Sequence, residues 1–218
     1  MSLDRTKIQW FRRTMREWSR ENFRDFPWRR TKDPYAILAA EFLLQKTDAP
    51  TAAPFYEQFI DRYPNLEELA AGSIEEITAL LQPLGLHFRA SRLQETATIL
   101  VEQYKGKIPK IESKLLQLPG VGKYTARSVL ANSYNKPCAV LDTNVARILE
   151  RVFGLKGGGV KSRDPLLWRA AEQVAPKTKV GIWNLTLIDF GAAVCTAKNQ
   201  NCSDCPLQRQ CHYFESSL

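Results

Sequence analysis

Four cysteines near the C-terminus have the spacing of a metal site. Cys195, Cys202, Cys205 and Cys211 form a C-x6-C-x2-C-x5-C array, whereas Cys138 stands apart. A cytosolic protein rarely keeps structural disulfides, so clustered thiols indicate metal binding. A zinc ribbon usually has two close cysteine pairs, and only Cys202 and Cys205 form one here. Four thiolates also suit a 4Fe-4S cluster, so the residues alone leave both metals open.

Two carboxylates stand in settings that could serve catalysis. Asp142 ends a short apolar run directly before a helical pattern. It is either a helix N-cap or a carboxylate placed for chemistry. Glu41 lies in the apolar segment 37–44. It is either on a solvent-facing stripe or buried, and burial would raise its pKa toward that of a useful acid.

A glycine-containing turn, 118–122, separates two helical patterns. Gly120 and Gly122 can adopt backbone angles closed to other residues, so that main-chain N–H groups can approach a phosphate. The helix that starts near Lys123 would direct its positive end at that phosphate. The alternative is an ordinary helix–helix connection. The turn therefore indicates a DNA-backbone contact only in combination with other signals.

The elements that position these residues are helices, and the pattern predicts an all-α fold. An N-terminal amphipathic helix carries recurring apolar residues and polar-face arginines: Ile8, Phe11, Met15 and Trp18; Arg12, Arg13, Arg16 and Arg20. An apolar helix follows over 35–46. Two capping boxes open short helices over 65–71 and 74–82. A last long helix, 183–194, leads to the first clustered cysteine. A flexible link is expected from Gly154 to Pro165, where Gly157-Gly158-Gly159 interrupts the helical pattern.

Composition narrows the class of protein. The 218 residues are 44% hydrophobic, enough for one large or two small domains. The longest apolar run is too short to span a bilayer and the N-terminus lacks a signal peptide, so we expect a cytoplasmic protein with no membrane partner. The net charge of +8 favours a polyanionic partner and salt-sensitive binding.

Together, 118–126 and 140–145 resemble the helix-hairpin-helix plus Gly/Pro-Asp motif of the endonuclease III superfamily of DNA glycosylases. The chain is most similar to the adenine glycosylase (MutY) and mismatch thymine glycosylase branches, from about Phe26 to Cys211. The resemblance implies two helical domains, a six-helix domain over 25–136 and a cluster domain from 1–24 and 137–218. A DNA-binding cleft would separate them. It also implies that the four cysteines hold a 4Fe-4S cluster.

The resemblance assigns chemical roles. Breaking the bond between deoxyribose and base puts positive charge on the sugar, which Asp142 would stabilise. Glu41 would hydrogen-bond or protonate the leaving base. Both would face the cleft. Tyr124 occupies the position where bifunctional members carry a Schiff-base lysine, and a phenol cannot form that intermediate. The implied activity is a monofunctional DNA repair glycosylase that leaves an abasic site.

DNA contacts follow from the same resemblance. The target nucleotide must leave the base stack, so side chains must fill the gap. Gln45 matches the family's inserting glutamine, and Leu86 or His87 its wedge loop. Phosphate contacts fall to the hairpin and the helix after it, through Gly120, Gly122, Lys123 and Arg127. The implied partner is double-stranded DNA, bound by a monomer associated with the nucleoid.

Two positions bear on the target base. The adenine branch typically has valine at Ala49 and glutamine at Leu185, whereas the mismatch thymine branch has alanine and leucine. An apolar wall suits the thymine methyl. The chain also ends seven residues after Cys211, without the second domain usual in adenine glycosylases. We therefore expect removal of thymine or uracil opposite guanine, although Thr143 departs from both branches.

Two alternatives stay open. A truncated adenine glycosylase would act on A·G or A·8-oxoguanine. A non-catalytic DNA-binding or redox-sensing iron–sulfur protein would need the hairpin and the cluster alone. Binding requires neither Glu41 nor Asp142, so their joint presence favours an enzyme.

Overall fold

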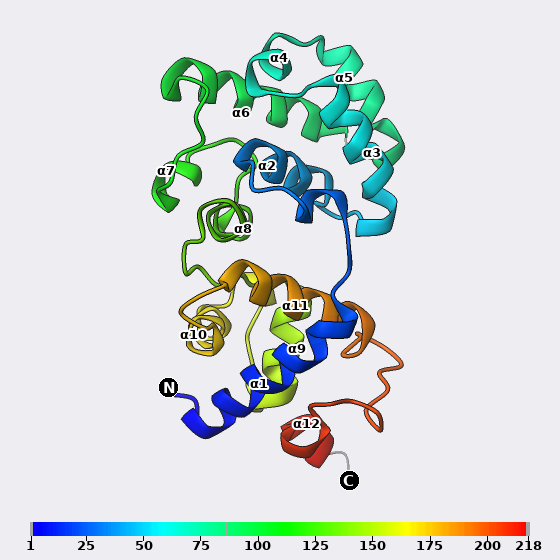
Figure 1. Ribbon diagram of the computed structural model, residues 1–218, viewed down its shortest axis with the longest axis vertical. Coiled ribbons are helices and arrows are strands. Elements are labelled where there is room, and N and C mark those ends of the chain that lie inside the picture. The colour runs from blue at the N-terminus through cyan, green and yellow to red at the C-terminus, as the bar shows by residue number, and fades with distance from the viewer. Residues whose placement is uncertain (1, 86, 217–218) are drawn as a thin grey trace. The chain divides into compact units, whose positions relative to one another are not determined.

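The computed structural model describes residues 2–85 and 87–216, without the side chains of residues 87 and 88 (Figure 1). The regular elements in this described part are all helices, as the sequence pattern predicted. None of its helices is long and apolar enough to cross a membrane. The chain divides into two compact units, Asp25–Tyr134 and the combination of Met1–Arg24 with Asn135–Leu218. We call the first the hairpin unit and the second the cysteine unit.

The hairpin unit is built on α2, which is buried along almost its whole length. Asp33 caps this helix by accepting the N–H of Tyr35 at 3.0 Å. Residues 35–43 are all buried, Glu41 among them. The helices of this unit are η1 (Pro27–Arg29), α2 (Pro34–Leu43), α3 (Ala49–Arg62), α4 (Leu66–Ala71), α5 (Ile74–Leu81), η2 (Gln82–Leu84), α6 (His87–Tyr104), α7 (Glu112–Leu115) and α8 (Lys123–Tyr134).

Both capping boxes open helices as predicted. The Asn65 side chain accepts the N–H of Glu68 at 2.8 Å at the start of α4. The Ser73 hydroxyl accepts the N–H of Glu76 at 3.3 Å at the start of α5. These bonds satisfy N–H groups that have no partner inside the helix, which fixes where each helix begins.

The cysteine unit packs an aromatic core. Phe11 contacts Phe153 and Trp183 edge-on, with ring centroids 5.4 and 5.5 Å apart, and Trp18 meets Phe190 at 5.1 Å. The N-terminal helix is therefore held by its predicted apolar face. The helices of this unit are α1 (Arg5–Asn22), α9 (Thr143–Phe153), η3 (Lys161–Arg163), α10 (Pro165–Val174), α11 (Val180–Ala193), η4 (Gln208–Gln210) and α12 (His212–Glu215).

Helix α11 also holds the two chain segments of the cysteine unit that lead to and from the hairpin unit. Its Asp189 is fully buried and accepts Arg24 Nε at 2.6 Å. Its Asn184 accepts the N–H of Val140 at 3.3 Å and donates to the carbonyl of Cys138 at 2.9 Å. Removing one partner from such a buried pair leaves a charge or an amide uncompensated. These bonds place the segment that ends at Asp142.

The glycine-rich segment is held in place, whereas the sequence predicted a flexible link. The N–H of Gly157 donates to Glu150 Oε1 at 2.9 Å, and the N–H of Gly158 donates to Asp164 Oδ2 at 2.7 Å. Lys161 Nζ also donates to Glu150 Oε1, at 2.7 Å. The three glycines predicted flexibility because glycine restricts the backbone least. The acceptors Glu150 and Asp164 reach this segment through tertiary packing, which the local sequence does not reveal.

Candidate functional site

Asp142 is the N-cap of α9, and both of its carboxylate oxygens are engaged. Oδ1 accepts the N–H of Val145 at 2.7 Å, and Oδ2 accepts Asn144 Nδ2 at 2.8 Å. The side chain is half-buried. Burial raises the pKa of Asp142, against the opposing effect of the Val145 and Asn144 hydrogen bonds. The capping and catalytic interpretations are thus compatible, because a cap fixes the orientation of a carboxylate whose free lone pairs remain for chemistry.

Asn144 and Arg147 hold that carboxylate, and sequence reasoning missed both. Asn144 Oδ1 accepts Arg147 Nη2 at 2.7 Å. The same guanidinium donates from Nε to the carbonyl of Cys195 at 2.6 Å and from Nη2 to the carbonyl of Gly191 at 2.7 Å. The signal available was that Asn144 and Arg147 lie two and five residues after Asp142, within the first turns of one helix.

Glu41 is buried in the hairpin unit, at 8% exposure, which decides against the solvent-facing alternative. Ser128 Oγ on α8 donates to Glu41 Oε1 at 2.5 Å, and Asn132 Nδ2 donates to Ser128 Oγ at 3.1 Å. A buried carboxyl fixed by a short bond keeps one orientation. Ser128 and Asn132 were also missed. They recur with Thr125 at helical spacing on the buried side of α8, which was the available signal.

The hairpin turn matches its predicted geometry at one of its two glycines. Gly120 has φ of +76°, whereas Gly122 has no left-handed φ. A Cβ on Gly120 would meet Phe42 Cε1 at 2.8 Å, but a Cβ on Gly122 would meet nothing within 4 Å. Gly120 is therefore required by the fold. Gly122 leaves open space beside the start of α8, where a phosphate could approach the backbone.

Substituting alanine at each glycine separates these two roles. We expect Gly120→Ala to lower the free energy of unfolding by about 1–2 kcal/mol, because alanine is strained in the left-handed region and clashes with Phe42. Gly122→Ala should leave stability unchanged and weaken binding of a mismatched duplex severalfold. Urea unfolding and fluorescence titration measure the two effects. Equal loss of stability in both variants would contradict this division.

The predicted DNA-contact residues differ in how the structure holds them. Lys123 is exposed at the first position of α8, and Tyr124 is half-buried after it. Arg127 Nε pairs with Glu112 Oε1 at 2.9 Å, and its side chain is only 14% exposed, so Arg127 also ties α8 to α7. Gln45 Nε2 donates to the carbonyl of Gly120 at 3.2 Å, which links the turn that follows α2 to the hairpin.

Four further predicted site residues are Ala49, Leu185, Leu86 and His87. Ala49 is the half-buried first residue of α3, and Leu185 is half-buried on α11. Of the two wedge candidates, Leu86 lies outside the described residues and His87 is described only as the first residue of α6.

The four clustered cysteines line one small cavity of the cysteine unit, which Cys138 does not reach. Apolar side chains, Val152, Phe190, Val194 and Leu207, form much of its wall. Arg151 Nη1 donates to Cys195 Sγ at 3.4 Å. Within the described residues, no three His, Cys, Asp or Glu side chains are already grouped as a bound ion would require.

The donor set nevertheless fits an iron–sulfur cluster in number and in chemistry. Burial, together with the neighbouring thiolates, raises the pKa of Cys205 to about 11. Four thiols in one apolar cavity cannot all ionise unless cations are present between them. A cluster supplies those cations, and Arg151 adds a hydrogen bond to sulfur of the kind that clusters accept.

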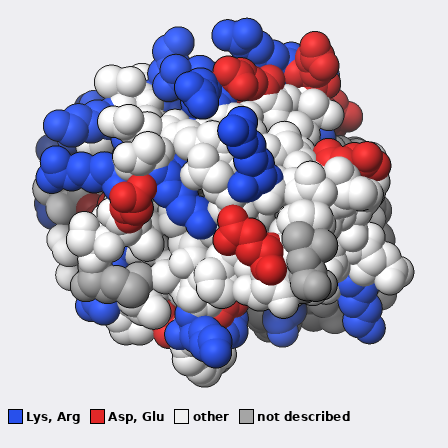
Figure 2. All heavy atoms as spheres, turned by 90° about the horizontal axis from the view of Figure 1, so that it is seen from below, with Lys and Arg blue, Asp and Glu red and all other residues white. Residues whose placement is uncertain are grey.

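Basic side chains cover more of the face drawn in Figure 2 than acidic ones, in keeping with the net charge of +8.

The sequence also matches a known family. Residues 39–173 match the HhH-GPD superfamily of base excision DNA repair proteins. The chain therefore belongs to this superfamily.

Relatives within the family are named DNA glycosylases. The chain is 41% identical to a thymine-DNA glycosylase of Aeropyrum pernix over 98% of each chain. It is 40% identical to a thymine/uracil-DNA glycosylase of Pyrobaculum aerophilum, over 94% of this chain and 92% of that one. It is 34% identical to an adenine DNA glycosylase of Buchnera aphidicola, over 86% of this chain and 54% of that one.

A solved structure supports the same assignment. A thermostable thymine-DNA glycosylase superposes with a TM-score of 0.89 at 34% identity, covering 97% of this chain and 98% of that one. The protein is thus a DNA glycosylase of the base excision repair family with an endonuclease III-type fold, as the motifs predicted.

Proposed function

We propose that this enzyme removes thymine or uracil mispaired with guanine and leaves an abasic site, acting as a monomer on double-stranded DNA in the cytoplasm. Leu185 is the observation that carries the choice of base. Its half-buried leucine side chain offers an apolar surface where an amide would be needed to read the edge of adenine. Ala49 leaves more room than valine would. Two relatives with thymine in their names, similar over more than nine-tenths of this chain, support the proposal.

In this proposal Asp142 stabilises the sugar. The bond from C1′ to the base nitrogen breaks with its electron pair leaving on the base, and positive charge develops on the deoxyribose. A carboxylate fixed by Val145 and Asn144 needs no reorganisation to face that charge, and its partial burial strengthens the interaction. Water then adds to C1′, and its proton is lost to the carboxylate or to solvent.

Glu41 acts on the departing base in the proposal. The bond from Ser128 fixes the orientation of its carboxyl group, which hydrogen-bonds or protonates the departing base. Tyr124 then limits the enzyme to base release, because a phenol cannot form a Schiff base with the sugar. Efficient borohydride trapping of a protein–DNA adduct would argue against this part of the mechanism.

DNA would be gripped by the hairpin through Gly120, Gly122 and Lys123, with Arg127 as a further phosphate contact. Gln45, Leu86 and His87 would fill the space that the extruded nucleotide leaves. Cys195, Cys202, Cys205 and Cys211 would hold a 4Fe-4S cluster, whose contribution when bound is to cross-link the C-terminal segment of the chain. The segment that carries the four cysteines also includes the carbonyl of Cys195, to which Arg147 Nε donates.

Single-turnover base release from four matched duplexes tests the proposal. We expect release from T·G and U·G and little from A·G or A·8-oxoguanine. The double variant Ala49→Val with Leu185→Gln should lower release of thymine at least about tenfold, because the added amide loses its hydrogen bonds beside the thymine methyl. Leu116→Gln makes the same change at an exposed leucine and should have no effect.

Adenine removal is the second candidate, favoured by the similarity to an adenine glycosylase. Release from the adenine duplexes alone would establish it and would leave the role of Asp142 intact. A folded protein that binds all four duplexes and releases no base from any would instead support a non-catalytic DNA-binding module.

A further inference from the structure

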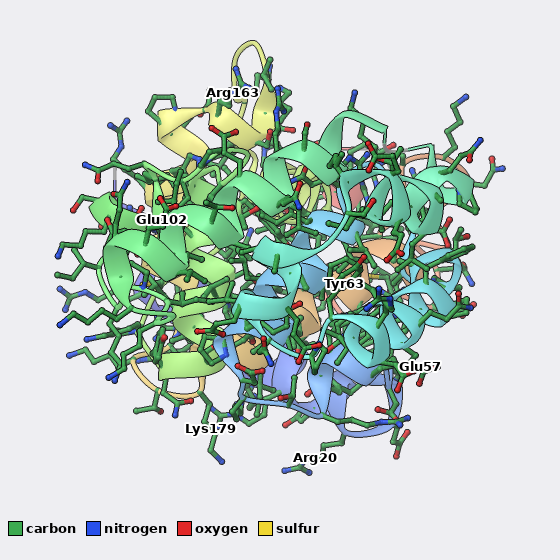
Figure 3. All side chains as sticks on the ribbon, turned by 90° about the horizontal axis from the view of Figure 1, so that it is seen from above. Arg20, Glu57, Tyr63, Glu102, Arg163 and Lys179 are labelled. Atoms are coloured by element: carbon green, nitrogen blue, oxygen red, sulfur yellow. The ribbon has the colours of Figure 1, made fainter. Side chains whose placement is uncertain are left out.

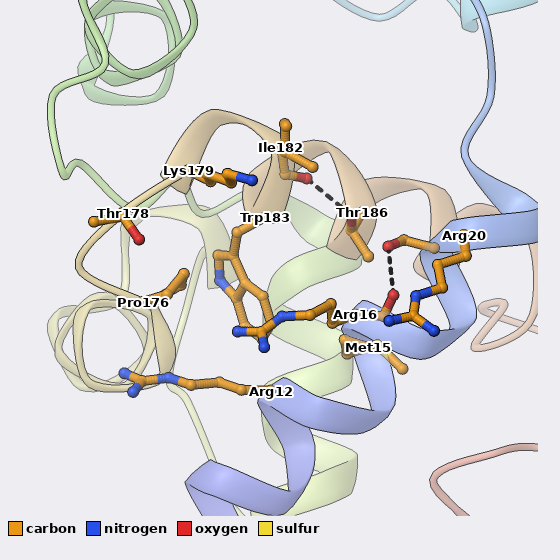
Figure 4. Close-up of a pocket in the computed structure, with 11 residues that line it drawn as sticks. Arg12, Met15, Arg16, Arg20, Pro176, Thr178, Lys179, Ile182, Trp183 and Thr186 are labelled. Atoms are coloured by element: carbon orange, nitrogen blue, oxygen red, sulfur yellow. Dashed lines mark hydrogen bonds between the residues drawn. The ribbon is translucent and has the colours of Figure 1, made fainter.

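A groove between α1 and α11 in the cysteine unit plays no part in the mechanism above. It encloses about 500 Å³, within the range of ligand-binding cavities. The apolar side chains among its lining are Met15, Pro176, Ile182 and Trp183, of which Figure 4 shows Trp183 facing α1. Ile182 is 51% exposed, so its side chain is accessible to an occupant of the groove. We call this feature the α1 groove.

The rim of the α1 groove is strongly basic. Arg12, Arg16 and Arg20 repeat every fourth residue along α1, which places them on one ridge about 12 Å long. Lys179 lines the groove from the start of α11, and no Asp or Glu is among the described residues that line it. Arg20 and Lys179 both project outward at the same edge in Figure 3.

Arg12 differs from the other rim cations. Its guanidinium donates to the carbonyls of Gln173, Val174 and Ala175 and so caps the end of α10. In the described part of the chain, no side-chain hydrogen bond or ion pair engages Arg16 or Lys179. The groove therefore presents charge without an acidic partner beside apolar side chains, and an occupant with acidic and apolar groups would complement both.

A second cavity of about 310 Å³ continues the groove toward the N-terminus. It shares Arg12 with the first and is also lined by Leu3, Arg5 and Ile8. The two cavities follow the length of α1, so the occupant they fit is elongated. A small molecule would use only one of them.

We propose that the α1 groove docks an acidic, amphipathic segment of a partner protein. Its apolar side chains would pack on Ile182 and the other apolar side chains of the groove, while its carboxylates would face Arg16, Arg20 and Lys179. A DNA backbone would use the charges and leave these apolar side chains without a partner. A second copy of this chain is disfavoured because a net charge of +8 repels itself.

A peptide selection tests this proposal. Phage-displayed random dodecapeptides are selected on the full-length protein, and the most enriched sequences are synthesised with a fluorescent label. We expect sequences that combine Asp or Glu with Leu, Ile, Phe or Trp. Arg16→Glu with Arg20→Glu should weaken their binding about tenfold or more, and Ile182→Ser should weaken it severalfold.

Arg13→Glu is the matched control, since Arg13 is exposed on α1 and lines neither cavity. It should bind the peptides as the unmodified protein does. Base release at saturating enzyme should be unchanged by the Arg16 and Arg20 substitutions, which separates this proposal from the catalytic one. Enrichment of non-acidic peptides, or equal losses in the control, would overturn the proposal. Weaker duplex binding by the groove variants without peptide binding would assign the groove to DNA.

Discussion

Asp142→Asn is expected to slow single-turnover base release by about a thousandfold or more, while duplex binding persists. The amide keeps one oxygen for the N–H of Val145 but carries no negative charge to stabilise the sugar. Its NH₂ group would also face Asn144 Nδ2, a second donor, and Asn144 cannot turn its own oxygen inward without losing Arg147. The variant thus removes the negative charge and also disturbs the hydrogen bond from Asn144 that orients the side chain.

Asp164→Asn is the matched control for that experiment. Asp164 caps α10 in the same unit and accepts the N–H of Leu167 at 2.9 Å, and its backbone hydrogen bonds lower its pKa, whereas burial raises the pKa of Asp142. We expect Asp164→Asn to retain the unmodified rate of base release. An Asp142→Asn enzyme with a normal rate would remove Asp142 from the mechanism.

The raised pKa of Asp142 also means that the ionised form of this proposed catalytic carboxylate lowers the stability of the fold. Above the pKa of the unfolded chain, about 3.9, the unfolded state ionises more readily than the folded one, so the free energy of unfolding falls as the pH rises through the folded pKa. Asp142→Asn removes this cost. Its stability relative to the unmodified protein should therefore be greater at pH 7 than at pH 3, as urea unfolding would show. The rate of base release should fall when the pH drops below the raised pKa.

The second large effect is expected at the cysteines. Cys205→Ser should lose iron and lower the free energy of unfolding by about 4 kcal/mol, a decrease of about 10 °C in Tm, because the C-terminal segment loses its cross-link. Iron and sulfide analysis, together with thermal unfolding followed by circular dichroism, measures both results.

Cys138→Ser provides the comparison, since this cysteine does not line the cavity of the other four. It should retain iron and change stability by less than about 1 kcal/mol. Zinc in place of iron in the unmodified protein would refute the proposed cluster and leave the four ligands standing. Full iron content in Cys205→Ser would remove that residue from the ligand set.

The sequence determined the helical class and the local chemistry of this protein, because both depend on residues close together in the chain. Capping boxes at Asn65 and Ser73 set the starts of α4 and α5, and the spacing of the last four cysteines defined a set of thiols. The hairpin and Asp142 were recognisable because backbone requirements restrict which residues a tight turn and a helix cap accept.

Tertiary structure decided how each carboxylate is held. Glu41 could have been exposed or buried, and only the packing of α2 in the hairpin unit, with Ser128 from α8, makes it a fixed buried acid. Asp142 depends on Arg147, whose acceptors at Gly191 and Cys195 lie more than forty residues away. Such partners follow from packing between distant helices, which no local pattern encodes.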